Sequence, residues 1–431
     1  MARAMKDSGV DWIGQIPENW KVERLSGHLK EINEKNCPLK TTQILSLTNK
    51  LGVIPYEEKG NQGNKAKENY EEYKVAYKDT IIANSMNILI GSVGYSKYYG
   101  CVSPVYYVFK EKPENSLWFI NYIMQTPQFQ RELRKYANGI LEIRLRLSAN
   151  DILKRQVAFP PYQEQKKIAA FLDDKCAAID EIITKTEQSI EEYKKLKQAV
   201  ITKAVTQGIR PNRTMKDSGI DWIGKIPVDW DVRKLRYLYK CQNGISKSAD
   251  FFGHGFPFVS YKDVYDNDEL PVSVSGLCNT TEEERDRYSV KRGDIFFTRT
   301  SETIEEIGLT SICLNTIENA TFAGFLIRCR PYTSKLDFNY AKYYMISSHL
   351  RLYFVKEMNL VIRASLSQEL LKDLCILIPS PEEQKEIADY LDMKCTEIDA
   401  LIEKKQQSLT ELASYKKSLI YEYVTGKKEV D

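Results

Sequence analysis

Residues 163–183, QEQKKIAAFLDDKCAAIDEII, recur at residues 382–402 as EEQKEIADYLDMKCTEIDALI, with 12 of 21 positions identical. From this segment, apolar or aromatic residues continue in steps of three and four for more than 30 residues, and each has a counterpart 219 residues later. Such spacing predicts one long helix with an apolar stripe in each half of the chain. Because an apolar stripe must be covered, we expect the two helices to pack against each other.

The two helices are expected to form an antiparallel coiled coil, with a helical hairpin inside a single core as the alternative. The second helix begins with Ser380-Pro381-Glu382-Glu383, which supplies an N-cap, a first-turn proline and a capping-box acid. The first begins at Pro160-Pro161-Tyr162 and lacks the serine. The predicted interface residues are Ile168, Leu172, Ile179, Ile183 and Leu196 in the first helix, and Ile387, Leu391, Ile398, Ile402, Leu412 and Leu419 in the second.

A second repeat lies ahead of each helix. MKDSGVDWIGQIPENW at residues 5–20 returns at residues 215–230 as MKDSGIDWIGKIPVDW, with 12 of 16 positions identical. Each half of the chain is therefore a globular segment followed by a long helix. The predicted boundaries are 1–160 and 210–378 for the two globular domains, and 161–209 and 379–431 for the two helices.

The globular segments combine short strands with helical stretches. FPFVSYKDV and RGDIFFTRTS have the pattern of strands, whereas residues 117–137 have that of helices. The predicted fold class is α+β, with two related mixed α/β domains, two antiparallel helices and an approximate two-fold relation between the halves. The globular segments otherwise align only sparsely, which favours two related modules with different targets.

Composition places the chain among globular proteins, with 42% hydrophobic and 28% charged residues in 431 residues. The 62 basic and 59 acidic residues leave a net charge of only +3, which is less than a protein that covers DNA alone usually carries. Basic faces are therefore expected to be local, with partners supplying further phosphate contacts. The lack of an 18-residue apolar run or an apolar leader predicts a cytoplasmic protein without a membrane anchor.

No metal or cofactor is expected, because the nine cysteines occur singly and the three histidines are far apart in the sequence. Residues 251–255 match the FxGxG of S-adenosylmethionine-binding loops but are expected to form a turn. Phe159-Pro160-Pro161-Tyr162 approximates the motif of amino-methyltransferases, yet Phe159 cannot accept a hydrogen bond from a base. Glu164-Gln165-Lys166 and its copy at 383–385 fit a nuclease ExK, but they lie in the first turn of a helix, where acids favour the dipole. No catalytic residue is assigned.

The doubled MKDSGxDWIGxIPxxW, with FPPYQEQKKIAAFLD, IPSPEEQKEIADYLD and the closing LIYEYVTGKKEV, resembles the specificity (S) subunit of Type I restriction–modification systems. The resemblance covers the whole chain, and it implies two target recognition domains that each contact one half of a split, asymmetric site in double-stranded DNA. It also implies that the helices act as a spacer and dock two methyltransferase subunits, through which restriction subunits join. The sequence departs from the pattern at Pro161 and at the polar stripe positions Thr186 and Lys405.

Residue types that read bases or support phosphates occur at turns in both globular segments. An offset of 215 residues, which matches Asp79 to Asp294, places the pair at 84–85 opposite the pair at 299–300, so the same strand end is expected to contact DNA in both halves. The candidate DNA-binding residues are Asn84, Ser85, Tyr95 and Lys97 in the first segment, and Asn243, Ser246, Lys247, Thr298, Arg299, Thr300 and Ser301 in the second.

A non-catalytic DNA specificity subunit is the leading hypothesis. The alternative is a coiled-coil scaffolding protein with two protein-binding domains, and an enzyme comes third. Sequence-specific DNA binding separates the first two hypotheses.

Overall fold

The computed structural model describes residues 3–48, 52–60, 69–137, 146–300, 306–358 and 366–430. The chain divides into two compact units. Unit 1 comprises Met1–Glu187 and Gln407–Asp431, and unit 2 comprises Gln188–Gln406. Each unit thus contains one globular part and a portion of both long helices. The separate domain and helix segments proposed from the sequence stay a prediction.

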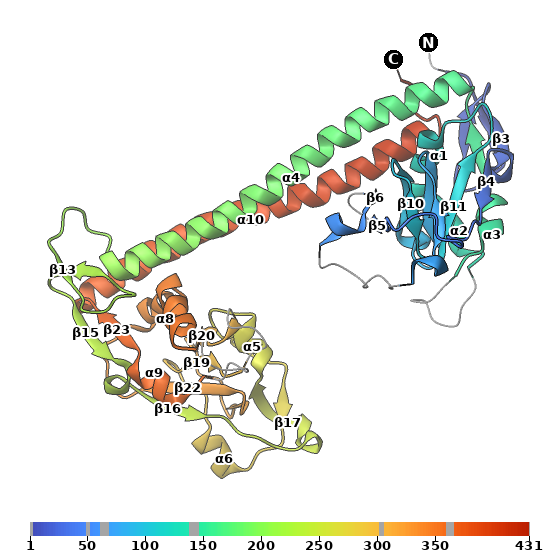
Figure 1. The fold of residues 1–431 in the computed structure, drawn as a ribbon. Coiled ribbons are helices and arrows are strands. Elements are labelled where there is room, and N and C mark those ends of the chain that lie inside the picture. The colour runs from blue at the N-terminus through green and yellow to red at the C-terminus, as the bar shows by residue number, and fades with distance from the viewer. Residues whose placement is uncertain are drawn as a thin grey trace. The chain divides into compact units, whose positions relative to one another are not determined.

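Unit 1 is built around a four-stranded antiparallel sheet with the order β4-β11-β8-β9; Figure 1 labels β4 and β11 of this sheet. The strands are β4 (Leu29–Ile32), β11 (Tyr106–Glu111), β8 (Thr80–Asn84) and β9 (Val93–Ser96). All five residues of β8 are buried, so both faces of this strand are covered. Its sequence, TIIAN, fits this position, because a strand buried on both faces is read as a nearly continuous apolar run.

Helices and strand pairs surround this sheet. Helix α1 (Leu117–Gln125) and helix α2 (Pro127–Arg134) are capped by Ser116 and Thr126, whose hydroxyls accept the third backbone N–H of each helix. Unit 1 also contains the pairs β1 (Met5–Asp7) with β2 (Gln15–Pro17), β3 (Lys21–Arg24) with β12 (Gln156–Phe159), β5 (Leu45–Thr48) with β6 (Gly52–Pro55) and β7 (Lys74–Ala76) with β10 (Gly100–Val102), and helix α3 (Ala149–Leu153).

Unit 2 repeats the same architecture. Its main sheet has the order β16-β22-β19-β20, and the strands are β16 (Tyr239–Asn243), β22 (Leu326–Pro331), β19 (Ile295–Thr298) and β20 (Thr310–Ile312). The central β19 is buried at all four positions, as β8 is in unit 1. The two sheets share their order and their antiparallel pairings, although their sequences have diverged.

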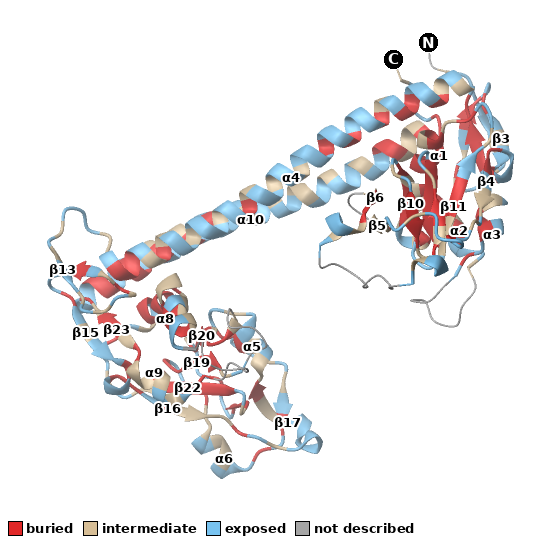
Figure 2. Ribbon diagram, viewed as in Figure 1, coloured by how far each residue is buried: buried red, intermediate tan, exposed pale blue. Residues whose placement is uncertain are grey.

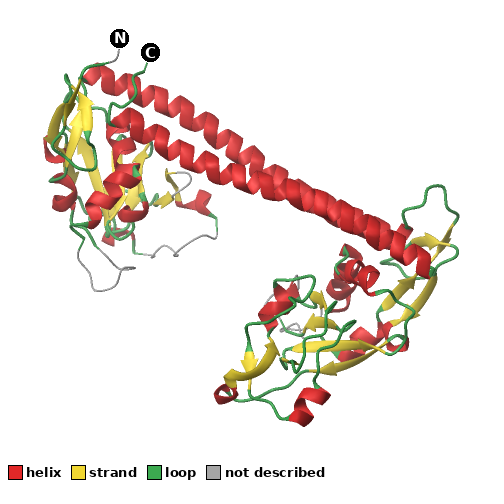
Figure 3. Ribbon diagram, turned by 180° about the vertical axis from the view of Figure 1, so that it is seen from behind, coloured by secondary structure: helices red, strands yellow, loops and turns green. Residues whose placement is uncertain are grey.

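The other elements of unit 2 fall into a shared set and an added set. The shared set is β13 (Met215–Asp217) with β14 (Lys225–Pro227), β15 (Asp231–Lys234) with β23 (Cys375–Ile378), and helices α7 (Phe338–Met345), α8 (Ser348–Met358) and α9 (Gln368–Asp373). The added set is β18 (Leu277–Cys278), α5 (Tyr261–Tyr265) and α6 (Glu282–Arg287). Strand β17 (Phe252–Val259) pairs in parallel with β21 (Thr321–Phe322), and unit 1 has a parallel bridge between Ile44 and Cys101 instead. Figure 3 shows strands and helices mixed in each unit, as the α+β prediction requires.

Two long helices, α4 (Tyr162–Gln207) and α10 (Pro381–Val424), pack antiparallel. Within unit 1, the rings of Phe171 and Tyr423 lie 4.5 Å apart, and Lys416 Nζ lies 2.6 Å from Asp180 Oδ1. Within unit 2, Lys197 Nζ lies 2.7 Å from Asp399 Oδ2. Since higher numbers in α4 meet lower numbers in α10, the predicted antiparallel pairing is confirmed.

Most residues of the predicted stripe are buried or half-buried, and Figure 2 shows buried positions along both long helices. Their contact with the partner helix stays a prediction. Leu196 is the exception: the side chain is 48% exposed, so its assignment to the interface is wrong. Ile190 and Ile201 are buried, and Lys197 between them pairs with Asp399 of the other helix. Leu196 follows Ile190 by two consecutive steps of three, which fall short of 3.6 residues per turn and turn it away from this contact line. The buried predicted residues are Ile168, Leu172, Ile179, Ile387, Leu391, Ile398 and Leu419, and the half-buried ones are Ile183, Ile402 and Leu412.

Leu172→Ala should lower the free energy of unfolding by about 2–5 kcal/mol, because this side chain is fully buried and its truncation leaves a cavity. Leu391→Ala, at the matching position of α10, should have a similar effect. Leu196→Ala is the control and should change stability by less than about 0.5 kcal/mol. Urea denaturation followed by circular dichroism measures all three. An equal loss for Leu196→Ala would contradict the described interface.

Candidate nucleic-acid interface

The ends of β8 and β19 are equivalent, but the predicted residue pairing is wrong by one position. Asn84 lies opposite Tyr106, and Thr298 lies opposite Leu326 in the matching ladder. The next residue makes the same backbone bonds in both units: Ser85 N–H donates to Val105 O, and Arg299 N–H donates to Phe325 O. Ser85, and not Asn84, is therefore the counterpart of Arg299.

The shift arises ahead of the strands. Asp79 is separated from Ile81 by one residue, whereas Asp294 directly precedes Ile295, the counterpart of Ile81. The two aspartates also have different roles. Asp79 accepts a hydrogen bond from the Tyr95 hydroxyl, and the fully buried Asp294 accepts from Arg330. An alignment on the aspartates alone could not reveal the missing residue.

Two of the candidates at this strand end support the backbone. The Asn84 side chain accepts the Met86 N–H at 3.0 Å, and the Thr298 hydroxyl accepts the Leu309 N–H at 2.9 Å. Asn84, Ser85 and Thr298 are all buried. Arg299 is half-buried and Thr300 is exposed, so they are the described candidates at this end that face solvent. Ser301 lies outside the described residues.

In unit 1, Tyr95 and Lys97 belong to an aromatic cluster on Trp118. The rings of Tyr95 and Trp118 stack with centroids 4.3 Å apart, and Lys97 Nζ lies 5.5 Å from the Trp118 ring. Burial raises the pKa of Tyr95, and its hydrogen bond to the Asp79 carboxylate raises that pKa further. The Tyr95 hydroxyl is therefore a neutral donor, while the exposed Lys97 side chain can reach a phosphate.

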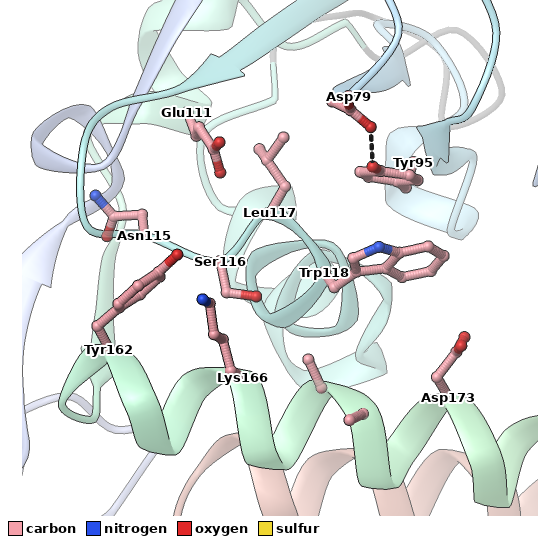
Figure 4. Close-up of a pocket in the computed structure, with 12 residues that line it drawn as sticks. Asp79, Tyr95, Glu111, Asn115, Ser116, Leu117, Trp118, Tyr162, Lys166 and Asp173 are labelled. Carbon is pink, nitrogen blue, oxygen red and sulfur yellow. Dashed lines mark hydrogen bonds between the residues drawn. The ribbon is translucent and has the colours of Figure 1, made fainter.

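Beside this cluster is a pocket of about 360 Å³, drawn in Figure 4. Helix α4 contributes Lys166 and Asp173 to its lining, and the sheet side contributes Asp79 and Glu111. Burial raises the pKa of Glu111. With three carboxyl groups around a single lysine, this pocket is not suited to a phosphate, so the DNA-binding candidate in this region is Lys97 on the exposed surface.

The first candidate group in unit 2 is partly engaged in internal contacts. Asn243 Oδ1 accepts from Gln368 Nε2 at 2.9 Å. Lys247 Nζ lies 2.6 Å from Glu284 Oε2 and also donates to the Asn279 carbonyl, so it ties its loop to helix α6. The exposed Ser246 remains available. Contact of any of these candidates with DNA stays a prediction.

The Glu-Gln-Lys motif of each helix fastens the helix to its globular part. In unit 2, Glu383 Oε2 accepts from Trp230 Nε1 at 3.0 Å, and the Glu383 carboxylate pairs with Arg213. In unit 1, Glu164 Oε1 accepts from Trp20 Nε1 at 3.1 Å and pairs with Arg3 at 2.7 Å. Trp20 and Trp230 are fully buried. The acids thus do more than favour the helix dipole, because they satisfy the N–H of a buried indole.

The glutamines of the same motif add a second attachment. The Gln384 amide accepts the Asp337 N–H at 2.7 Å and donates to the carbonyls of Lys335 and Pro379. Gln165 likewise accepts the Ser116 N–H at 3.0 Å. Both glutamines are buried.

The FxGxG segment forms the irregular start of strand β17 instead of the predicted turn, with Gly253 and Gly255 at positive φ.

Two features of the helices were missed in the sequence. The ion pairs Asp180–Lys416 and Lys197–Asp399 are copies of each other, since each residue has its counterpart 219 positions away. The recurrence of these polar residues 219 positions apart was the signal from which the ion pairs could have been predicted.

Among the described residues, no helix is long and apolar enough to cross a membrane, and no cluster of three His, Cys, Asp or Glu side chains could hold a metal ion.

Comparisons with known proteins agree with this architecture. A family model described as the Type I restriction modification DNA specificity domain matches residues 17–192 and again residues 227–411. The chain is 24% identical over 425 residues to the Type I restriction enzyme MjaVIII specificity subunit of Methanocaldococcus jannaschii, covering 96% of this chain and 94% of that protein. It is also 24% identical over 294 residues to the Type I restriction enzyme EcoBI specificity subunit of Escherichia coli, covering 65% and 60%.

Two solved structures have a similar fold. A chain from a study of complex assembly and conformational transition of the type I R-M system has a TM-score of 0.73, with 16% identity, and the match covers 96% of this chain and 99% of that chain. The HsdS subunit from Thermoanaerobacter tengcongensis has a TM-score of 0.51, with 15% identity and coverage of 96% and 98%. At these identities the likeness concerns the fold alone.

Glu383→Ala should lower the free energy of unfolding by about 3 kcal/mol, because it leaves the buried Trp230 N–H without its acceptor and removes one of the two carboxylates that pair with the mostly buried Arg213, the other being Asp229. Glu386→Ala, one turn away, is the matched control. Its exposed pair with Arg210 should contribute less than about 1 kcal/mol. Chemical denaturation compares the two variants, and equal effects would rule out a special role for the Trp230 contact.

Proposed function

Because the chain belongs to the Type I restriction modification DNA specificity family, we propose that each of its two units reads one half of a split, asymmetric DNA site. The chain has the role of a specificity subunit. The family match over both halves does not support the alternative of a coiled-coil scaffold with two protein-binding domains.

One observation carries the two-site proposal. Both units keep the same four-stranded sheet and the same Trp–Glu attachment to the long helices, yet the loops and added elements around the sheets differ. A shared scaffold with unlike surfaces suits two modules that bind the same kind of ligand and distinguish different sequences of it. Lys97 in unit 1, and Ser246, Arg299 and Thr300 in unit 2, are the candidates whose exposure permits direct contact.

The proposed partners follow from the same family role. We expect the paired helices to dock two methyltransferase subunits, with restriction subunits joining through the methyltransferase and the assembly acting on DNA in the cytoplasm. The chain itself would bind DNA without methylating or cleaving it. Methyl transfer or cleavage by the pure chain, free of partner subunits, would overturn this part of the proposal.

The direct test is to map methylated bases in genomic DNA from cells with and without this gene. A specificity subunit should add one methylated motif that has two defined parts separated by unspecified bases. Restoring the gene should restore the motif. A methylome that does not depend on the gene, in cells that retain an active methyltransferase partner, would contradict the proposed function.

Arg299→Ala should weaken recognition of one half-site only, because a lost side-chain contact to a base costs about 1–3 kcal/mol at the affected position. Lys97→Ala should affect binding near the other half-site. Binding assays with duplexes substituted in one half-site at a time measure both variants. If Arg299→Ala weakens binding to all sequences equally, Arg299 contacts a phosphate or is only a surface residue, and it does not read a base.

A four-residue insertion after Gln188 and after Gln407 should lengthen the gap between the half-sites. Four helical residues add about 6 Å and restore most of the helical phase, so the apolar faces should still meet. Base pairs are about 3.4 Å apart, so the gap should grow by about one or two base pairs while both half-sites persist. Methylome sequencing reports the gap. Full activity with an unchanged gap would show that the helices do not set it.

A further inference from the structure

The main sheet of unit 2 has a strongly basic hollow of about 620 Å³ on one face. Its lining includes Lys240, Arg287, Arg328 and Arg330, together with Gln242 and Tyr332. No carboxylate lines the hollow among the described residues. Because the whole chain has a net charge of only +3, four cationic side chains around one hollow mark a local concentration of charge.

The strand register places these cations on neighbouring positions. Lys240 of β16 lies opposite Arg330 of β22, and Gln242 lies opposite Arg328. Alternation along a strand directs these four side chains to one face, away from the buried Cys241 and Cys329. Like charges directly opposite each other destabilise a sheet. The arrangement is therefore costly unless an anion compensates for it.

The two arginines are held in place by the protein. Arg328 donates to the Ser289 carbonyl at 2.5 Å and to Gln242 Oε1 at 2.6 Å. Arg330 donates to the same Ser289 carbonyl at 2.8 Å and forms a two-point contact with Asp294 at 2.7 and 2.5 Å. These contacts fix the guanidinium groups before any ligand arrives, which reduces the entropy that binding would cost.

The positive charge of the hollow is only partly neutralised. Asp294 pairs with Arg330, but within the described part of the chain no carboxylate forms an ion pair with Lys240, Arg287 or Arg328. Arg328 is 4% exposed, and its Nε–H has no described acceptor. Burial lowers the pKa of Arg328 to about 10, and the charge of Arg330 also lowers it, although Asp294 acts in the opposite direction.

The same like-charge pair recurs in unit 1, where Lys30 lies opposite Lys110 at the matching register. There, however, Ile32 and Val108 occupy the positions of Gln242 and Arg328. The basic pair is thus common to both sheets, while the buried arginine and the helix α6 cation Arg287 are particular to unit 2. Unit 1 therefore has no counterpart of these two arginines.

We propose that this hollow in unit 2 is a phosphate-binding site that holds the sugar-phosphate backbone of DNA beside the half-site read by the same unit. The inference rests on the proposed function and adds residues that the sequence did not single out. Lys240 and Arg287, both exposed, would contact phosphate oxygens, and Arg328 and Arg330 would supply the fixed charge beneath them. A phosphate contact positions the duplex without reading its sequence.

A DNA phosphate is favoured over a protein carboxylate by the size and rim of the hollow. The exposed Tyr332, 59% accessible, borders the basic residues and offers a flat surface to a sugar or base. Three of the four cations lack an ion-pair partner among the described residues, which suits a ligand with several charges in a row. Free phosphate shares the same chemistry, so the experiment must separate the two sources.

The test uses the full chain, alone and with its methyltransferase partner, and measures DNA affinity over a range of salt concentrations. The double variant Lys240→Ala/Arg287→Ala should reduce the slope of log affinity against log salt by about 1–2, because each phosphate contact contributes about 0.9 to that slope. Affinity should fall by the same factor for cognate and unrelated DNA. The control Lys234→Ala/Lys356→Ala removes two lysines that are already paired with Asp373 and Asp221, and it should leave the slope unchanged.

A parallel titration with inorganic phosphate at constant ionic strength identifies the source of the phosphate. Competition with DNA that disappears in the double variant would support the shared site. If the hollow binds phosphate but the double variant keeps the wild-type DNA slope, the hollow holds a free anion and the proposal is wrong. The proposal is also wrong if the double variant loses only its association with the methyltransferase. The glutamine double variant Lys240→Gln/Arg287→Gln repeats the measurement if the alanine variant unfolds.

The two proposals fail in different ways. If the wild-type chain prefers a sequence but the double variant keeps the wild-type slope, the phosphate site is wrong and the proposed function stands. If the slope falls in the double variant while the wild-type complex shows no sequence preference, the phosphate site stands and the proposed function is wrong. Absence of any DNA binding overturns both.

Discussion

The contact between a buried indole and a helix-start glutamate determines how each unit is assembled. Trp20 and Trp230 are fully buried, and an indole N–H in that position must find an acceptor. Glu164 and Glu383 provide it from the first turn of α4 and α10. The tryptophan ends the repeated segment 5–20 or 215–230, and the glutamate lies in the repeated segment 163–183 or 382–402, so this bond joins segments more than 140 residues apart in sequence.

The end of the other helix meets the same tryptophan. Gly426, just beyond α10, has a positive φ, and a Cβ there would lie 2.4 Å from Pro17 and 3.2 Å from the Trp20 ring. Gly208, just beyond α4, also has a positive φ, and a Cβ there would lie 2.8 Å from Arg213 Nη1, 2.9 Å from Glu383 Oε1 and 3.3 Å from the Trp230 ring. A glycine is required at both positions because the backbone conformation and the close approach leave no room for a side chain. The start of one helix and the end of the other are thus held by one residue in each unit.

The repeated parts of the chain could be predicted from the sequence, and the diverged parts could not. Long apolar stripes and paired motifs predicted the antiparallel helices and the mixed domains. Two predictions were wrong because each depended on the position of a single residue. Leu196 is exposed and lies outside the contact line, and one residue fewer after Asp294 than after Asp79 shifts the pairing of the strand ends. The burial of Asn84 and Thr298 and the pairing of Lys247 with Glu284 depend on tertiary neighbours, which residue type alone does not reveal.

The two copied ion pairs have a consequence for the origin of the molecule. Helix α4 carries Asp180 and Lys197, and α10 carries their counterparts Asp399 and Lys416. Each helix thus has one acidic and one basic residue, which pair with the basic and the acidic residue of the other helix. One half of the chain therefore contains a self-complementary surface and is equipped to pair with an identical copy. Such a homodimer would be limited to palindromic targets. Joining two copies in a single polypeptide removes that limit, because each reading surface can then mutate without changing the other.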